Sequence, residues 1–333
     1  MAATIRDIRD RTGLSLATIS KYLNGGNVLP QNRELIEKAI DELHYEVNEL
    51  ARGLVTNKTK TIGVLVYDIE CLFVGNMLHY LGRELHKEGY GMLISDSSND
   101  EEMEAKNLQF LLSRKVDGII VFAVSLNGKF LEPAKKANVP VVLIDRAFQD
   151  EEYDCVEIDN RTAAFRAVTK LVENNHRRIA VIASDIEYTG MERVKGYSDA
   201  VKQTGVQIPE YYRKFGRHSF ELGYENMKAL LQLPEPPTGV ILGNYDTMLG
   251  GIMALNESGL SCPEDISLIG FDDLLMSKVI RPKLWLLVQP MQEMCIKAIE
   301  MLLKRINGEN EGPPQKISYA TSLREGNSIQ KLE

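Results

Sequence analysis

The sequence is poor in cysteine, histidine and long apolar runs, and each shortage excludes a class of protein. Its 333 residues include four cysteines without a CxxC pair and five histidines without HxxxH spacing, which argues against disulfide scaffolds and metal sites. No apolar run approaches the ~18 residues of a membrane span, and the start MAATIRDIRD has no signal-peptide core. We therefore expect a cytoplasmic protein with buried free thiols and no metal.

The motifs of common nucleotide enzymes and hydrolases are also missing. No GxGxxG follows the first apolar strand pattern, and no GxSxG occurs anywhere. The Asn127-Gly128-Lys129 fragment lacks the first glycine of a P-loop. No spacing singles out a carboxylate pair for acid–base work. The sequence therefore favours binding over catalysis, with no cofactor and no catalytic residues.

The composition is that of an ordinary globular protein, with 44% hydrophobic and 26% charged residues and a formal net charge of -8. A chain of this length predicts two or three domains. Residues 1–60 carry nine Lys/Arg and eight Asp/Glu, so the amino-terminal part is near neutral on an acidic body. This balance excludes a general polyanion binder but not a sequence-specific one.

Residues 4–44 show the pattern of three short helices. Thr4, with Asp7 three residues later, predicts one helix start, Ser15 predicts a second, and a third helix follows Pro30. Apolar residues at helical spacing are the candidate core: Ile5, Ile8, Leu14, Ala17, Ile19, Leu23, Leu35, Ile36, Ala39, Ile40 and Leu43. The polar stretch 56–60 predicts a linker.

After residue 60, apolar strand patterns alternate with helical ones, which predicts parallel sheets covered on both faces. The predicted strands are 62–68, 91–97, 118–124, 139–146, 178–184, 239–244 and 266–273. The predicted helices lie near 74–89, 101–115, 161–174, 191–204, 219–232, 246–258 and 291–306. These are too many strands for one compact sheet, so we predict two doubly wound subdomains that divide near 159–160.

Polar residues end most of these strands: Asp68, Asp96, Asp145, Ser184, Asn244 and Asp272. Ligands of parallel sheets bind beyond the carboxyl ends of the strands, so these side chains predict a cleft lining. Capping of the following helices is the alternative for each of them.

Several segments in this order resemble a LacI/GalR-type transcription regulator over essentially the whole chain: SLATISKYLN, LARGL, PVVLIDR, HRRIAVI, ERVKGY, PEDISLIGFDD and VQPM. The resemblance implies an all-α helix-turn-helix headpiece at 1–46, a hinge helix and linker at 47–60, and an α/β effector and dimerisation domain at 61–333. In it, two doubly wound parallel-sheet subdomains of periplasmic-binding-protein type would comprise about 61–160 with 291–320, and about 161–290 with 321–333.

The resemblance makes the segment after Gly13 a recognition helix in the major groove. Leu16, Ala17 and Lys21 would read base edges, while Ser15 and Thr18 would bind phosphates. Lysine stands where the family usually has arginine and lacks its bidentate fork, so discrimination of guanine should be weaker. Leu16 as a core residue and Lys21 as a solvated charge are the alternatives. The remaining implied headpiece contacts are Thr4 and Asn24.

The 48–55 stretch, NELARGLV, resembles the hinge helix that enters the minor groove. Leu54 would be the wedge between base pairs, with Asn48, Ala51 and Arg52 beside it. The proline that usually precedes this helix is Val47 here, so we expect a hinge that is disordered without DNA. A simple tether over 46–60 is the alternative.

The resemblance places an effector in the cleft of the body. The implied effector-binding residues are Asp68, Glu70, Phe73, Asp145, Arg146, Arg193, His218, Asn244, Asp272 and Gln289. Asp145 and Arg146 are alternatives at one position, and Asp272 could instead cap a helix or pair between subdomains. His218 stands where an aromatic platform is usual; Phe220 and Trp285 are the alternatives for that face, although Trp285 on a strand is more often core. Glu70 disfavours anions, which favours a neutral sugar-like effector.

The implied partners are a palindromic operator, a small sugar-like effector and a second copy of the chain. One alternative is a regulator controlled by a phosphoprotein co-repressor, docked on Arg83, His86 and Lys87, which are otherwise a plain charged face. Another is a sugar-binding protein that needs no DNA.

Overall fold

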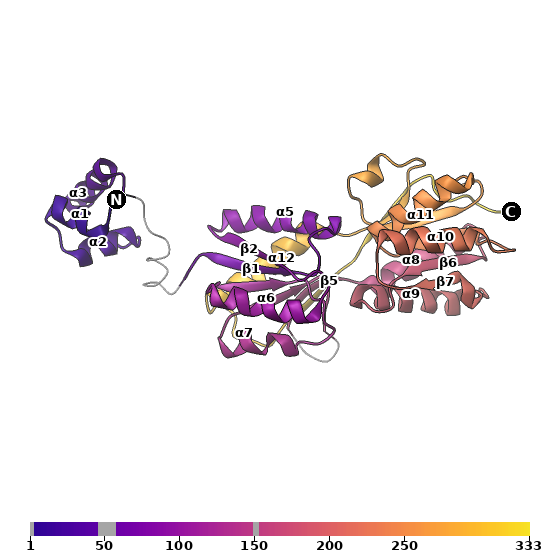
Figure 1. The fold of residues 1–333 in the computed structure, drawn as a ribbon, viewed down its shortest axis with the longest axis horizontal. Coiled ribbons are helices and arrows are strands. Elements are labelled where there is room, and N and C mark those ends of the chain that lie inside the picture. The colour runs from indigo at the N-terminus through magenta and orange to yellow at the C-terminus, as the bar shows by residue number, and fades with distance from the viewer. Residues whose placement is uncertain (1–2, 46–57, 149–152) are drawn as a thin grey trace. The chain divides into compact units, whose positions relative to one another are not determined.

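The computed structural model describes residues 3–45, 58–148 and 153–333. Its contacts divide the chain into two compact units, Met1–Lys60 and Thr61–Glu333 (Figure 1). The first unit is helical, and the second contains two parallel-stranded lobes. No helix in the described ranges is long and apolar enough to cross a membrane.

The described part of the amino-terminal unit contains three helices, α1 (Ile5–Thr12), α2 (Leu16–Leu23) and α3 (Pro30–Leu43). Its buried centre is formed by Ile8, Ile19, Ile36 and Ala39. The predicted caps are confirmed, because Thr4 and Asp7 form a capping box and the Ser15 hydroxyl accepts a 3.1 Å bond from the Thr18 N–H. Two predicted core residues, Ala17 and Leu35, are exposed instead, since only one face of each short helix meets the others.

The N-lobe is built on a six-stranded, all-parallel sheet with the order β11-β5-β4-β3-β1-β2. Its strands are β1 (Thr61–Val66), β2 (Gly91–Asp96), β3 (Gly118–Val121), β4 (Val141–Ile144), β5 (Asp154–Ile158) and β11 (Lys316–Tyr319). Helices α5 (Leu72–Lys87) and α12 (Met291–Ile306) pack together on one face, and α6 (Glu101–Ser113) and α7 (Glu132–Lys136) on the other (Figure 1). In β1, Val64 belongs to the apolar cluster under α5 and α12, and Leu65 belongs to the cluster under α6 and α7.

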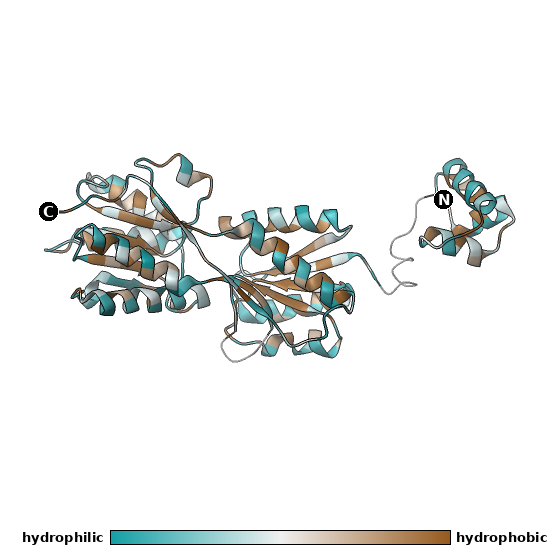
Figure 2. Ribbon diagram, turned by 180° about the vertical axis from the view of Figure 1, so that it is seen from behind, coloured by the Kyte–Doolittle hydropathy of each residue, from teal (hydrophilic) through white to brown (hydrophobic). Residues whose placement is uncertain are grey.

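The C-lobe repeats this plan with the order β12-β10-β9-β8-β6-β7, in which only β12 is antiparallel. Its strands are β6 (Ile179–Ala183), β7 (Arg213–Phe215), β8 (Gly239–Leu242), β9 (Ser267–Phe271), β10 (Trp285–Val288) and β12 (Ser322–Arg324). Its helices pack in two pairs, α8 (Asn160–Glu173) with α9 (Tyr188–Thr204), and α10 (Phe220–Leu231) with α11 (Tyr245–Ser258). Apolar strands lie inside and polar helix faces outside in both lobes (Figure 2).

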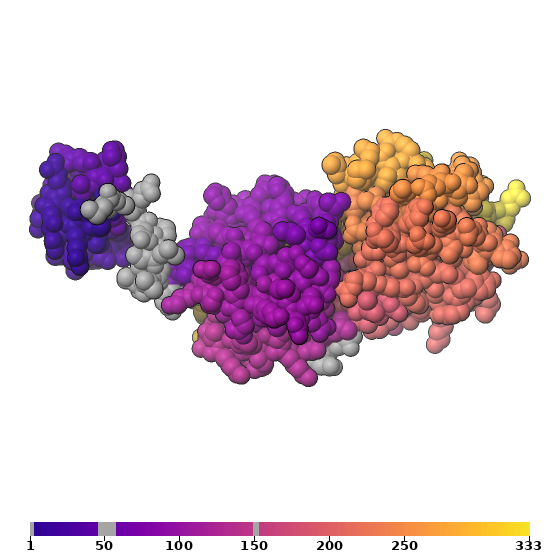
Figure 3. Space-filling model, viewed as in Figure 1, coloured from indigo at the N-terminus to yellow at the C-terminus, as the bar shows by residue number. Residues whose placement is uncertain are grey.

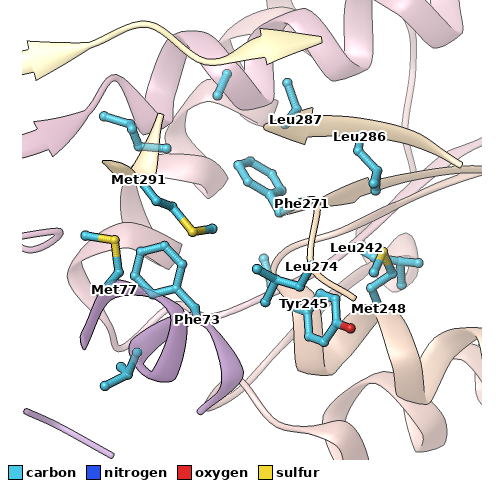
Figure 4. Packing of buried hydrophobic residues seen from close by; sticks show 14 of the residues in the cluster. Phe73, Met77, Leu242, Tyr245, Met248, Phe271, Leu274, Leu286, Leu287 and Met291 are labelled. Carbon is cyan, nitrogen blue, oxygen red and sulfur yellow. The ribbon is translucent and has the colours of Figure 1, made fainter. Parts of the chain in front are cut away.

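The chain passes between the lobes at three places in the described body: after β5, after β10, and between β11 and β12. Each crossing is short, so the carboxyl ends of the strands in both sheets lie near the junction. The lobe surfaces adjoin directly in the space-filling view (Figure 3). Apolar contact continues across the junction, where Phe73, Met77 and Met291 approach Leu274 and Tyr245 (Figure 4).

The predicted strand and helix pattern differs from the structure at the short elements. Strands β5, β7, β10, β11 and β12 and helix α7 are missing from the predicted ranges, because runs of only three to five residues carry too little pattern. The cysteine prediction is also partly wrong. All four thiols are free and Cys155 and Cys295 are buried, but Cys71 and Cys262 are partly exposed because they lie in loops.

Candidate functional site

A cavity of about 350 Å³ lies at the junction of the two lobes. It is at the small end of the range for ligand sites. All ten residues predicted for the cleft line it: Asp68, Glu70, Phe73, Asp145, Arg146, Arg193, His218, Asn244, Asp272 and Gln289. They come together because they follow β1, β4, β8, β9 and β10, or lie at the helix and loop that face these strand ends. Two predicted strand-end residues do not line the cavity: Asp96 and Ser184 bind loop N–H groups instead.

Arg193 is buried in α9 and held by the protein on three sides. Its Nε donates to Asn160 Oδ1 at 2.8 Å and its Nη1 donates to the Gly243 carbonyl at 2.5 Å. The guanidinium carbon lies 3.9 Å from the centre of the Phe271 ring. Five N–H donors are available to an arginine, so several remain for a ligand.

Asp145 and Asp272 occupy equivalent places in the two lobes. Each follows a central strand, each has a left-handed backbone (φ 70° and φ 71°), and each donates its N–H to a neighbouring strand. Non-glycine residues adopt this conformation uncommonly, and aspartate is among those that tolerate it best. Burial raises the pKa of each carboxyl to about 6. Among the described residues, Asp272 neither caps a helix nor forms an ion pair within 4.0 Å, so neither predicted alternative applies.

Gln289 fixes the orientation of Asp272 and leaves one polar atom unused. Its Nε2 donates to Asp272 Oδ1 at 2.8 Å. Its Oε1 has no hydrogen-bond partner in the described structure, although the side chain is only 5% exposed. A buried acceptor without a partner costs about 1–3 kcal/mol, so a ligand donor at this position would be favoured.

Arg146 belongs to the N-lobe and reaches toward the C-lobe. It lies 3.8 Å from Asp145 and 3.8 Å from Glu187, which precedes α9. Its Nη1 donates to the Ala123 carbonyl at 3.0 Å, and its guanidinium covers the Tyr67 ring. Asp145 and Arg146 were predicted as alternatives for one position, and both of them line the cavity.

His218 is held in one neutral form. The Ser184 N–H donates to its Nε2 at 3.1 Å, while its Nδ1 lies 2.9 Å from Glu187 and donates to that carboxylate. Burial lowers the pKa of His218. Burial alone would raise the pKa of Glu187, but the hydrogen bond from His218 lowers that pKa to about 2. The Phe220 ring also lines the cavity, whereas Trp285 lies outside it.

Nine further lining residues were not predicted: Tyr67, Cys71, Asn99, Glu187, Thr189, Ser219, Glu221, Tyr245 and Asp246. Most directly follow a strand or open a helix, so the first turn after each strand end was the signal that could have found them. Asn244 caps α11 through a 2.9 Å bond from the Thr247 N–H, and it also lines the cavity. No group of three acidic, histidine or cysteine side chains in the described ranges is placed to hold a metal ion.

The second predicted site is the surface of α2. Ser15, Leu16, Ala17, Lys21 and Asn24 are exposed, and Thr18 is half-buried. The 38% exposure of Leu16 is not that of a core residue. A shallow groove beside the helix is lined by Ala17, Thr18, Lys21, Asn27, Val28, Leu29, Pro30 and Asn32.

Three residues predicted to contact DNA also have structural roles. Thr4 and Ser15 cap α1 and α2, and the Asn24 Nδ2 donates to the Ser20 carbonyl at 2.8 Å. The predicted hinge residues Asn48, Ala51, Arg52 and Leu54 lie outside the described residues.

Most headpiece cations are paired within the unit. Arg9 pairs with Asp10, Arg33 with Glu37, and both Arg11 and Lys38 with Glu42. Arg6 and Lys21 have no ion pair among the described residues. In the body, the predicted co-repressor residues Arg83, His86 and Lys87 are exposed on α5, where Lys87 binds Glu84 at 2.7 Å.

Two parallel-sheet lobes around a polar cavity, preceded by a unit of three short helices, define a ligand-binding regulator. A family model described as a periplasmic binding protein-like domain matches residues 168–329. Catabolite control protein A of Priestia megaterium is 33% identical over 97% of this chain and 100% of its own. The chain therefore belongs to the LacI/GalR family of transcription regulators, and it is a regulator rather than an enzyme.

Two solved structures are similar over almost the whole chain. The transcriptional regulator CelR in complex with cellobiose is 26% identical, covers 98% of this chain and 99% of its own, and superposes with a TM-score of 0.73. The lac repressor dimer bound to operator and anti-inducer is 22% identical with a TM-score of 0.88, covers 99% of this chain and 100% of its own, and supports the fold alone. The predicted fold class is confirmed.

Proposed function

We propose that this chain is a dimeric transcriptional repressor that binds a palindromic operator. Its affinity for that operator rises or falls when a sugar-like effector binds. The observation that carries the proposal is the polar cavity lined from both lobes. Any molecule that fills it must contact both sheets, so its binding energy depends on how the lobes are placed. Effector binding is thereby coupled to a conformational equilibrium of the body.

The surface of α2 supports the DNA-binding half of the proposal. Ser15 and Thr18 offer hydroxyl groups at a helix N-terminus, which favours phosphate oxygens. Leu16 and Ala17 are exposed apolar groups that suit a thymine methyl, and Lys21 is the cation nearest to them in sequence. The groove beside α2 gives a base or phosphate a place against Ala17 and Thr18.

The cavity supports the sugar-like half. Its amides, carboxylates and arginines can donate to and accept from several hydroxyl groups at once, and Phe73, Phe220 and Tyr245 supply apolar faces. This mixture is typical of sites for polyhydroxylated ligands. The relative CelR is named with cellobiose, another polyhydroxylated molecule.

The coupling would run through contacts that cross between the lobes. Arg146 faces Glu187, and the Tyr188 hydroxyl donates to Glu157 at 2.8 Å beside Lys316. An effector that changes these contacts would change the placement of the N-lobe, from which the chain leads to the headpiece. A coupling free energy of ~1–3 kcal/mol suffices for useful switching.

The test combines DNA selection with ligand response. The purified protein should enrich a palindromic sequence from random duplexes at about 0.15 M salt, and an effector should change that affinity at least fivefold, as a coupling of ~1 kcal/mol requires. Equal binding to all duplexes would refute the repressor. Asp272→Ala should abolish the effector response while Glu225→Gln, on the exposed side of α10, leaves it intact. Response retained in Asp272→Ala would remove the cavity from the proposal.

A further inference from the structure

The cavity contains more carboxylates than its arginines offset. Asp145, Asp272 and Glu187 lie around Arg146 and Arg193, and their charges act on those two cations. Four further lining carboxylates have no ion pair among the described residues: Asp68, Glu70, Glu221 and Asp246. Glu70 and Glu221 are exposed at the mouth, where water screens them. The two half-buried members, Asp68 and Asp246, carry the uncompensated charge.

Asp68 and Asp246 belong to different lobes. Asp68 follows β1 in the N-lobe, and Asp246 lies in the first turn of α11 in the C-lobe. The Cys71 thiol, three residues after Asp68, lies 3.8 Å from Asp246 Oδ2. Burial raises the pKa of Asp246, and the charge of Asp68 raises it further. The two carboxylates therefore line one cavity from opposite lobes, where their like charges repel.

Neither carboxylate is saturated by the protein. Asp68 accepts one bond on each oxygen, from the Glu70 N–H at 2.9 Å and from Asn99 Nδ2 at 3.0 Å. Among the described residues, Asp246 accepts only from the Cys71 thiol, which is a weak donor. A carboxylate can accept about four hydrogen bonds, so both have acceptor capacity that faces a ligand cavity.

A second, independent observation points to a donor-rich ligand in the same cavity. Gln289 is only 5% exposed, and its Oε1 accepts no hydrogen bond within the described protein. Its Nε2 is already committed to Asp272, so the unused atom is an acceptor. An amide oxygen can also bind a metal ion, but no group of three acidic, histidine or cysteine side chains in the described ranges is placed to hold one. An organic donor therefore meets the demand.

We infer that the effector is a small organic cation, a polyhydroxylated molecule with a protonated amino group that binds between Asp68 and Asp246. Its hydroxyl groups would bind Gln289, Asn244 and Arg193. This inference rests on the proposed function and narrows its sugar-like effector to the amino sugar or amino polyol class. An ammonium group has three donors and no acceptor, so it can bridge two carboxylates that otherwise repel. The effector would thereby favour the closed arrangement of the lobes.

The test uses the full chain with matched probes that differ by one amino group. D-glucosamine and D-glucose, D-galactosamine and D-galactose, and glucamine and sorbitol form three such pairs, with N-acetylglucosamine as a neutral amide control. Calorimetry and thermal shift at pH 7 measure binding to the wild type, Asp68→Asn, Asp246→Asn and Glu225→Gln. Glu225 is an exposed residue of α10 outside the cavity, so its variant controls for the loss of one distant charge.

We expect at least one amine to bind at least tenfold more tightly than its neutral twin. Asp246→Asn should weaken that amine about tenfold, the effect of losing one charge-assisted bond, and change the neutral twin less than twofold. Glu225→Gln should change neither. The inference is overturned if neutral probes bind as well as their amines, if no amine binds, or if Asp246→Asn leaves the amine affinity unchanged. If the neutral sugars bind as tightly as the amines and still change operator affinity, the inference fails and the proposed function is unaffected. If the protein shows no preference for an operator, the proposed function fails, but the measured preference for amines is unaffected.

Discussion

The exposed face of α2 carries one cation, Lys21, among small polar and apolar side chains, whereas the cavity holds two buried arginines among seven carboxylates. Charge at the surface is screened by salt and contributes little per pair. The buried charges of the cavity are desolvated, so each unpaired group among them is costly and each added partner is valuable. In the proposed function, the helix would therefore discriminate among DNA sequences, and the cavity would respond strongly to one ligand.

The largest expected difference between the two regions is the loss of stability when one cation is removed from each. Arg193→Ala leaves the buried Asp272 without its main compensating charge, so we expect a loss of about 3 kcal/mol in the free energy of unfolding. Lys21→Ala should change it by less than about 0.5 kcal/mol, because surface positions contribute little. Urea unfolding measures both. Equal losses would mean that Arg193 is no more buried in solution than Lys21.

In DNA binding, unlike in stability, we expect a large effect from the cation on α2. Lys21→Ala should reduce the preference for the selected operator over random duplex by about tenfold, the worth of a good base contact. Its effect on non-specific affinity should be smaller. Fluorescence anisotropy with both duplexes separates the two quantities. A parallel decrease on both would make Lys21 a phosphate contact instead of a base contact.

The free energy of unfolding should depend on pH through the buried carboxylate of Asp272. The pKa of Asp272 is about 6 in the folded chain against 3.8 as the ordinary value, so the folded state binds more protons between these limits. Its ionisation therefore destabilises the fold as pH rises from 4 through 6. Asp272→Asn, which tolerates the left-handed backbone, should be about 1 kcal/mol more stable than wild type at pH 8. The advantage should vanish at pH 4, and an advantage that grows on acidification contradicts the assignment.

The smallest expected effect concerns the salt dependence of DNA binding. Because Glu42 holds Arg11 and Lys38, few headpiece cations are free for phosphates, and the log–log slope should be shallow for a dimer. Glu42→Gln should release Arg11 and steepen the slope by about one per headpiece. Titrations at several salt concentrations test this, with Asp41→Gln, an exposed neighbour without an ion pair in the described structure, as the charge control.

The residues that end parallel strands could be assigned to the cavity from the sequence, because the topology brings the carboxyl ends of a sheet to one edge. Asp145, Asn244 and Asp272 are of this kind. The positions of Glu187 and Asp246 at helix starts could have marked them as lining residues, but their partners in the other lobe, Arg146 and Cys71, could not be predicted because no local pattern encodes contacts between lobes. The short edge strands were missed for a related reason: their pairing partners, not their own residues, make them strands.

The crossing from β11 to β12 has a consequence for biosynthesis. Residues 316–319 pair with β5, which was translated about 160 residues earlier, and residues 322–324 pair with β10. Until the ribosome has released this late stretch, both sheets keep an unpaired edge, the kind of surface on which nascent chains aggregate. The same few codons then complete both lobes. The body should consequently reach its native state in one late step, rather than lobe by lobe as the polypeptide emerges.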